Sequence, residues 1–182
     1  MKDAMADFQQ IRDMLARLPQ PTDEALPSGT TDEVINGAQT AMGVRFPESF
    51  REWLKISNGP CVGPGGMFGV QTQRRSLDIE ELLTIYPEWR TQWIPVAGDG
   101  CGNYYVMPTA TDAGIEPPVI FFDTTESTKK PAYVVASSLP HFLVFLFEEE
   151  LGESYWPFRK ERVLAVDPDL KPYKDVPLPW DA

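Results

Sequence analysis

The chain has 182 residues, of which 42% are hydrophobic and 12% aromatic, so it can bury one good core and is short for two. Its 27 acidic and 16 basic side chains give a net charge of −11. That charge argues against a nucleic-acid binder, which needs a basic face, and suits a basic protein partner, although solubility alone also explains it.

Membrane insertion and secretion find no support in the sequence. No apolar run approaches the roughly 20 residues of a membrane span. The first ten residues, MKDAMADFQQ, lack the basic and apolar regions of a signal peptide. Because the cysteines are only Cys61 and Cys101, no disulfide framework is expected, and a reducing, cytoplasmic location is predicted.

Two helices are predicted in the first part of the chain. Over residues 4–18, apolar side chains recur at spacings of three and four, and Pro19 ends the pattern. This stripe consists of Met5, Phe8, Ile11, Leu15 and Leu18. It can dock on the core or on a partner, and the core is the favoured interpretation. After a linker rich in proline and polar residues, a second helix is predicted from near Thr31 to Gly43.

Two further helices flank a glycine-rich loop. Pro47 suits the first position of a helix whose apolar face holds Phe50 and Trp53. Residues 59–70 read as a surface loop that is rich in glycine. Asp78, with Glu81 three residues later, forms a capping-box pattern, which predicts a helix that runs through Ile85.

The middle of the chain, residues 93–108, predicts one β-hairpin. An apolar run is followed by the turn Gly98, Asp99, Gly100, Cys101, Gly102 and Asn103, and then by β-forming residues. The glycines permit the positive φ that a tight reversal needs, so Gly98, Gly100, Gly102 and Asn103 are assigned a structural role in the turn. Residues 117–125 and 131–138 predict two more strands, which together give an antiparallel meander.

The last part of the chain contains one strongly apolar helix. It is predicted to begin near Ser138 and to reach Leu151, and its nearly continuous apolar surface indicates a central core helix. Beyond it, residues 162–166 predict a short strand before an extended tail. The expected fold class is α+β, as a single domain with a twisted, mainly antiparallel sheet, helices packed on it, a peripheral N-terminal helix and a C-terminal tail.

Motifs in a defined order resemble the SUKH superfamily, named for yeast cell-wall-assembly regulators, whose bacterial members are mostly immunity proteins. The motifs are Gly43 with Phe46-Pro47, Asn58-Gly59, Ile94-Pro95-Val96-Ala97, Asp99-Gly100-Cys101-Gly102, and the segments 119–123 and 137–146. Family members often carry an acidic residue where this chain has Met107-Pro108. The resemblance covers residues 31–151, so residues 1–30 and 152–182 form terminal segments outside it.

No catalytic constellation is visible in the sequence. The GDGCG segment precedes a strand instead of a helix, which favours a hairpin turn over a phosphate cradle, and residues 59–69 lack the Lys-Ser/Thr of a Walker A loop. A cysteine nucleophile needs a base, and His141, the single histidine, is the one imidazole available. Asp99 and Asp123 can share a cation, although turn and strand-end roles are favoured. Neither a metal nor a cofactor is expected.

The resemblance implies a non-enzymatic protein-binding module, an immunity protein that neutralises a cognate toxin, commonly a nuclease. The alternatives are a regulatory scaffold of the cell-wall-regulator type and, third, an enzyme. The expected partner is a basic toxin domain, with no nucleic acid or membrane bound directly, and the protein is expected to be a monomer or weak dimer. Candidate contacts are Glu88, Trp89, Asp99, Glu148, Glu149 and Glu150. Trp156 and Trp180 are further candidates for partial exposure.

Overall fold

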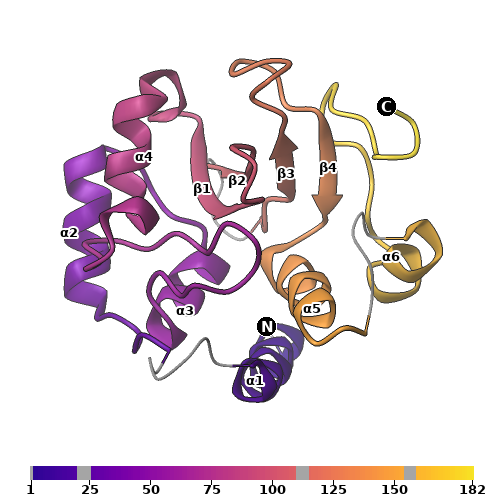
Figure 1. Ribbon diagram of the computed structural model, residues 1–182, viewed down its shortest axis with the longest axis horizontal. Coiled ribbons are helices and arrows are strands. Elements are labelled where there is room, and N and C mark those ends of the chain that lie inside the picture. The colour runs from indigo at the N-terminus through magenta and orange to yellow at the C-terminus, as the bar shows by residue number, and fades with distance from the viewer. Residues whose placement is uncertain (1, 20–25, 110–114, 154–158) are drawn as a thin grey trace.

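The computed structural model describes residues 2–19, 26–109, 115–153 and 159–182, with the backbone alone for residues 2–7. Its centre is an antiparallel sheet of four strands in the order β1-β2-β3-β4 (Figure 1). The strands are β1 (Trp93–Gly98), β2 (Tyr104–Pro108), β3 (Val119–Phe122) and β4 (Tyr133–Ala136). The predicted meander and the predicted single α+β domain are therefore confirmed.

The helices lie around this sheet. They are α1 (Lys2–Arg17), α2 (Asp32–Met42), α3 (Glu48–Ile56), α4 (Ile79–Ile85), α5 (Leu139–Glu150) and α6 (Lys160–Val166), with 3₁₀ turns η1 (Arg75–Leu77) and η2 (Pro87–Trp89). Figure 1 shows α2, α3 and α4 on the side of β1, and α6 on the side of β4. No helix in the described ranges is long and apolar enough to cross a membrane.

Local sequence signals set the helix ends. The Thr31 hydroxyl accepts a hydrogen bond from the Val34 N–H, and Gly43 ends α2 with a φ of 68°. Ser138 caps α5 in the same way, by accepting from the His141 N–H at 3.4 Å. At α4 the Asp78 carboxylate accepts from the Glu80 N–H at 2.9 Å. These starts and stops are confirmed where the sequence predicts them, but the predicted capping box does not close at Asp78, because the Glu81 carboxylate pairs with Arg75 and the Asp78 N–H donates to the Arg75 carbonyl.

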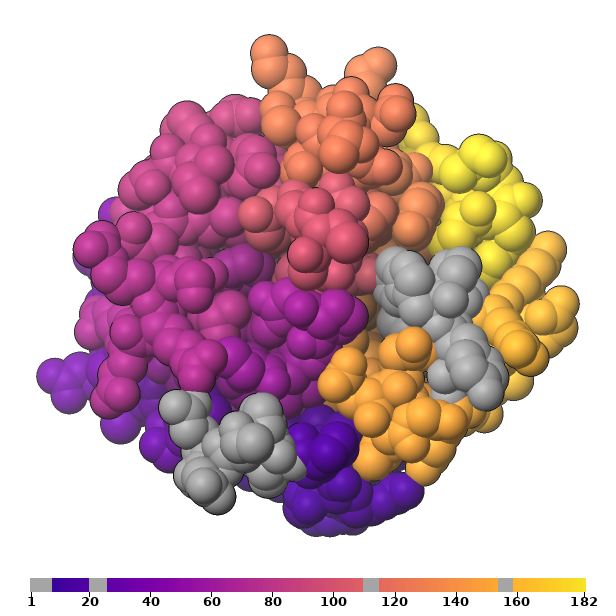
Figure 2. Space-filling view, in the orientation of Figure 1, coloured from indigo at the N-terminus to yellow at the C-terminus, as the bar shows by residue number. Residues whose placement is uncertain are grey.

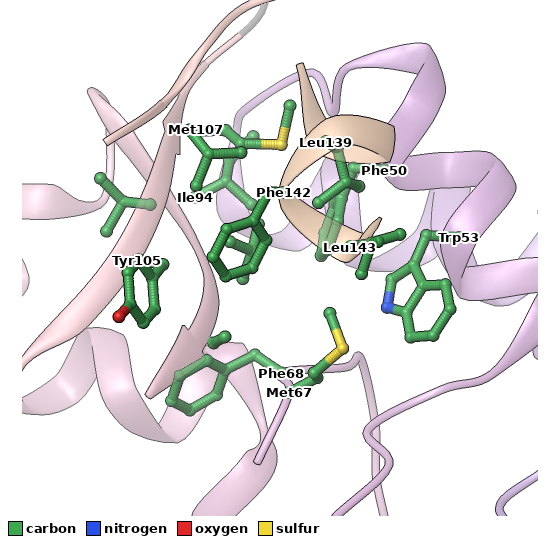
Figure 3. Close-up of a cluster of buried hydrophobic side chains, with 14 of the residues drawn as sticks. Phe50, Trp53, Met67, Phe68, Ile94, Tyr105, Met107, Leu139, Phe142 and Leu143 are labelled. Atoms are coloured by element: carbon green, nitrogen blue, oxygen red, sulfur yellow. The ribbon is translucent and has the colours of Figure 1, made fainter. Parts of the chain in front are cut away.

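The apolar helix α5 lies against one face of the sheet and forms the centre of the core. Its Phe142 ring is 4.8 Å from the ring of Tyr105 on β2 (Figure 3). Trp53 of α3 lies 6.0 Å from Phe147, and both side chains are fully buried. The prediction that α5 is the central core helix is confirmed.

The two terminal segments also bury apolar side chains. Helix α1 contacts α5, and the apolar stripe docks on the core through the buried residues Phe8, Ile11, Met14 and Leu15 and through Leu18 just after the helix. The Met5 side chain lies outside the described part of the chain. At the other end, the Val134 N–H donates to the Pro177 carbonyl at 2.9 Å, so the tail covers part of the outer edge of β4.

Two sequence interpretations are wrong. Residues 162–166 lie in helix α6 and not in a strand; the buried positions are Val163 and Asp167, four residues apart, and so short an apolar run fits either period. The glycine-rich loop is not simply a surface loop. Its Phe68 N–H donates to the Val96 carbonyl at 2.9 Å, and Met67, Phe68 and Val70 are buried along the outer edge of β1.

Candidate functional site

The β1–β2 turn is held together by one carboxylate. Asp99 Oδ1 accepts from the N–H groups of Cys101 and Asn103, at 2.7 and 2.9 Å, and Oδ2 accepts from Asn103 Nδ2 at 2.8 Å. The Asn103 amide oxygen in turn accepts from the Thr124 N–H at 3.0 Å, which ties the turn to the β3–β4 loop. Both Asp99 and Asn103 therefore hold the turn together, and the Asp99 side chain remains half-exposed.

The glycines of this turn are required for two different reasons. Gly100 and Gly102 have φ values of 79° and 96°, a region that side chains other than glycine rarely adopt. A Cβ on Gly100 would lie 2.8 Å from the carbonyl oxygen of Pro64, whereas one on Gly102 would meet no atom within 4 Å. Close packing against the glycine-rich loop also excludes a Cβ on Gly65, which would lie 2.5 Å from the carbonyl carbon of Gly98.

A groove of about 550 Å³ runs between α4 and the β1–β2 turn, and we call it the turn groove. It is lined by Leu82, Thr84 and Ile85 of α4, by Arg75, Ser76 and Glu81, by Phe68, Asn103 and Tyr104, and by Gly65, Gly98, Gly100 and Gly102. Figure 2 shows the turn near the middle of one face of the molecule, with the segment that contains α4 beside it. This groove is not predictable from local sequence, because its two walls are not adjacent in the chain.

Aromatic side chains from η2 and the end of α4 cover the sheet beside the turn groove. The Trp89 ring stacks on Tyr86, with 4.5 Å between centroids, and lies 4.8 Å from Phe122 of β3. Trp89 Nε1 donates to the Thr128 carbonyl at 2.7 Å. Trp89 is only 1% exposed, so its prediction as a partner contact is wrong. The 3₁₀ turn after α4 directs the indole into the core, whereas the neighbouring Glu88 is exposed.

The acidic run at the end of α5 is not a solvated patch throughout. Glu148 is only 6% exposed, and it accepts from Arg162 of α6, with Nε at 3.1 Å. A partner cannot reach Glu148 while α6 is docked, so this contact prediction is also wrong. Glu149 and Glu150 are half-buried. The Glu148 side chain lies among residues of α1 and α6, whereas Asp99 contacts the β1–β2 turn, so the structure separates the two predicted acidic groups.

A serine–histidine–aspartate cluster joins α6 to the junction of β4 and α5. Buried Asp167 accepts from the N–H and hydroxyl of Ser137, at 2.7 and 2.6 Å. His141 Nδ1 lies 3.0 Å from the Ser138 hydroxyl and 3.5 Å from Asp167 Oδ1. A catalytic triad needs the histidine to bridge serine and aspartate through opposite ring nitrogens. Here the hydroxyls of Ser137 and Ser138 and the carboxylate of Asp167 all lie near the same ring nitrogen, His141 Nδ1. The cluster therefore fastens the C-terminal segment instead.

The thiols and the acidic groups form no further constellation in the described ranges. Cys61 and Cys101 are free and exposed, and Arg74 Nη1 donates to Cys61 Sγ at 2.9 Å. The polar contacts of His141 are with Ser137, Ser138 and Asp167, not with a cysteine. Within the part of the chain that the structure describes, no group of three or more His, Cys, Asp or Glu side chains is arranged to hold a metal ion. Of the two other tryptophans proposed for exposure, Trp180 is half-buried beneath Lys160, and Trp156 lies outside the described residues.

A family model matches more than half of the chain. The model of the SMI1/KNR4 family (SUKH-1) matches residues 29–144. This range includes the sheet, the β1–β2 turn and the residues that line the turn groove. A search of curated proteins finds no match. The matched range begins just before α2 and ends within α5, so α1, α6 and the C-terminal tail lie outside it.

Proposed function

The chain belongs to the SMI1/KNR4 family (SUKH-1), and we propose that it neutralises a basic toxin domain by binding to it directly. The family supports a protein-binding module of the immunity or regulator type. We further propose that the toxin is a nuclease-type enzyme and that the chain itself performs no catalysis. A nuclease has a basic groove for phosphates, which an acidic protein can cover.

The observation that carries this proposal is the charge of −11 together with accessible acidic side chains that are not paired with a cation. Glu88 is exposed and Asp99 half-exposed, and within the described residues no cation forms an ion pair with either. In contrast, Glu80 and Glu81 are paired with Arg90 and Arg75. The unpaired carboxylates add to a negative field that attracts a basic partner over a distance of about one Debye length.

The test is a measurement of association rate at different salt concentrations. Tagged full-length protein is isolated from its own cells, and the captured partner is identified and purified. Raising the salt from about 0.01 M to about 1 M shortens the Debye length from about 30 Å to about 3 Å, and we expect the rate to fall by at least tenfold. A partner that is neutral or acidic, or a rate that does not change with salt, would overturn the proposal.

The regulatory alternative has one observation in its favour, because the matched family model itself carries the name of SMI1 and KNR4. A scaffold of that type would capture several regulatory proteins without abolishing an enzymatic activity. An immunity protein captures one toxin and blocks its activity in equimolar amounts. Assay of the captured partner's nuclease activity, with and without the protein, therefore separates the two functions.

A further inference from the structure

We propose that the turn groove is the surface that recognises the partner, and that its occupant is an arginine side chain of the basic toxin domain. This inference rests on the proposed function and adds the position of the contact and the chemistry of the group that is bound. It depends on three features of the turn groove, which are its bare glycine wall, its exposed apolar wall and its carboxylate.

The shape of the turn groove suits a long, thin side chain. One wall consists of Gly98, Gly100 and Gly102, which present backbone only. The opposite wall is formed by α4, where Ile85 is 66% exposed although it is a large apolar residue. An exposed apolar side chain beside a hollow is a feature of interaction sites, and the aliphatic stem of an arginine can cover it without burying a charge.

The polar groups of the turn groove suit a guanidinium group. Tyr104, which is half-exposed, offers part of a ring face, and a cation is attracted to such a face. The Glu81 carboxylate already accepts two N–H groups of the protein's own Arg75, with Nε at 2.9 Å. Arginine presents this planar fork and lysine does not, which is why we commit to arginine.

The Arg75–Glu81 pair engages the carboxylate but can be exchanged for a pair with a partner. The Arg75 side chain is 80% exposed, and exposed ion pairs contribute little to stability, so an incoming arginine can replace Arg75 at small cost. Asp99 lies between Gly98 and Gly100 in the chain, and its oxygens are used within the turn, so it adds negative charge beside the turn groove without lining it. The net −11 charge of the protein favours a cation over an anion at this position.

A defined probe tests the turn groove without the toxin. The isotope-labelled full chain is titrated with acetyl-Gly-Arg-Gly-amide and, separately, with the same tripeptide containing citrulline, which has the same shape but no charge. We expect the arginine peptide to shift the amide signals of Ile85, Gly102, Asn103 and Tyr104, with affinity of about millimolar. Equal shifts with the citrulline peptide, or shifts confined to another surface, would overturn the inference.

Two matched pairs of variants sharpen this test. Glu81→Gln is compared with Glu80→Gln, because both residues lie on α4 and pair with an arginine, but only Glu81 lines the turn groove. Ile85→Ser is compared with Ile115→Ser, because these residues are 66% and 70% exposed and only Ile85 lines the turn groove. We expect at least about a threefold loss of affinity for the arginine peptide in Glu81→Gln and Ile85→Ser, and none in the controls.

The same variants separate this inference from the proposed function. If wild-type protein binds its basic partner, and Ile85→Ser binds it as tightly as Ile115→Ser does, the turn groove is not the contact and the proposed function stands. If wild-type protein has no basic partner while the arginine peptide still binds in the turn groove, the proposed function fails. The inference about the partner then fails with it, and only the arginine site remains.

Discussion

The two faces of the sheet are covered in different ways. On one face, Tyr105 is 2% exposed and packs against Phe142 of α5, which is completely buried. On the other face, Tyr104 is half-exposed, and its neighbours are the rings of Tyr86, Trp89 and Phe68 from α4, η2 and the glycine-rich loop. The α5 face is a closed core, whereas the Tyr104 face opens at the turn groove. Stability is therefore expected to depend mainly on the first face and recognition on the second.

The largest effect that would test this division is truncation on the α5 face. Phe142→Ala removes a buried ring that lies between the sheet and α3, and it should lower the free energy of unfolding by about 3–5 kcal/mol. On the other face, Ile85→Ser should change it by no more than about 0.5 kcal/mol. Denaturant unfolding of both variants measures the difference. Similar costs would show that the two faces do not divide stability and recognition.

The next largest effect lies in the β1–β2 turn, where the two faces meet. Gly100→Val should cost about 2–3 kcal/mol, because it combines a positive φ with a Cβ 2.8 Å from the Pro64 carbonyl oxygen. Gly102→Val should cost about 1–2 kcal/mol, since its φ of 96° is strained but its Cβ meets no atom within 4 Å. Thermal unfolding compares the two variants. Unchanged stability in both would mean that the turn does not organise the sheet.

Adjacent tyrosines on opposite faces give a test by pH. Burial raises the pKa of Tyr105 strongly and that of Tyr104 to a smaller extent. When the pKa of a tyrosine is higher in the folded state than in the unfolded state, the difference stabilises the folded state fully at pH values below the unfolded pKa of about 10. This stabilisation is lost as the pH rises from the unfolded pKa toward the folded pKa. Above pH 10, therefore, Tyr105 should make stability fall by about 1.4 kcal/mol per pH unit.

The measurement is the free energy of unfolding between about pH 9 and pH 11 for the wild type, Tyr105→Phe and Tyr104→Phe. Tyr105→Phe should make the free energy of unfolding fall less steeply with pH above about 10, because the contribution of Tyr105 to that slope is removed. Tyr104→Phe should reduce the slope by a smaller amount. A lost hydrogen bond would lower stability equally at each pH and would leave the slope unchanged. Equal slopes in wild type and Tyr105→Phe would contradict the assignment of Tyr105 to a closed core.

Most of the fold could be predicted from the sequence because the signals that begin and end its helices and strands lie within short stretches of the chain. The cap at Ser138, the stop at Gly43 and the glycine turn each depend on residues within a few positions of one another. The order of four short motifs then indicated the family, which the match to residues 29–144 confirms. Residues 162–166 show the limit, since the helical spacing of the buried positions appears only when Asp167, beyond the apolar run, is counted with Val163.

The candidate site was less predictable because it depends on contacts between distant segments. Trp89 looked accessible beside Pro87, but Thr128, far along the chain, accepts its indole N–H. Glu148 looked solvated, but Arg162 of α6 covers it. The turn groove itself exists only because α4 and the β1–β2 turn come together in space. Periodicity and spacing carry no information about such pairs of segments.

The smallest expected effect concerns the two cysteines, of which Cys61 lies in the glycine-rich loop and Cys101 in the β1–β2 turn. Cys61 and Cys101 are both exposed, and within the described structure the polar contacts of His141 are with Ser137, Ser138 and Asp167, so neither thiol is paired with the imidazole that would activate it. The double variant Cys61→Ser/Cys101→Ser should stay within about 0.5 kcal/mol of wild-type stability. Its affinity for the partner should also be unchanged, because the turn groove is lined by neither thiol. The hydrogen bond from Arg74 to Cys61 can be kept by a serine hydroxyl.

Loss of partner binding with wild-type stability would contradict this expectation. It would mean that a thiol contributes directly to recognition and that the turn groove does not account for the contact alone.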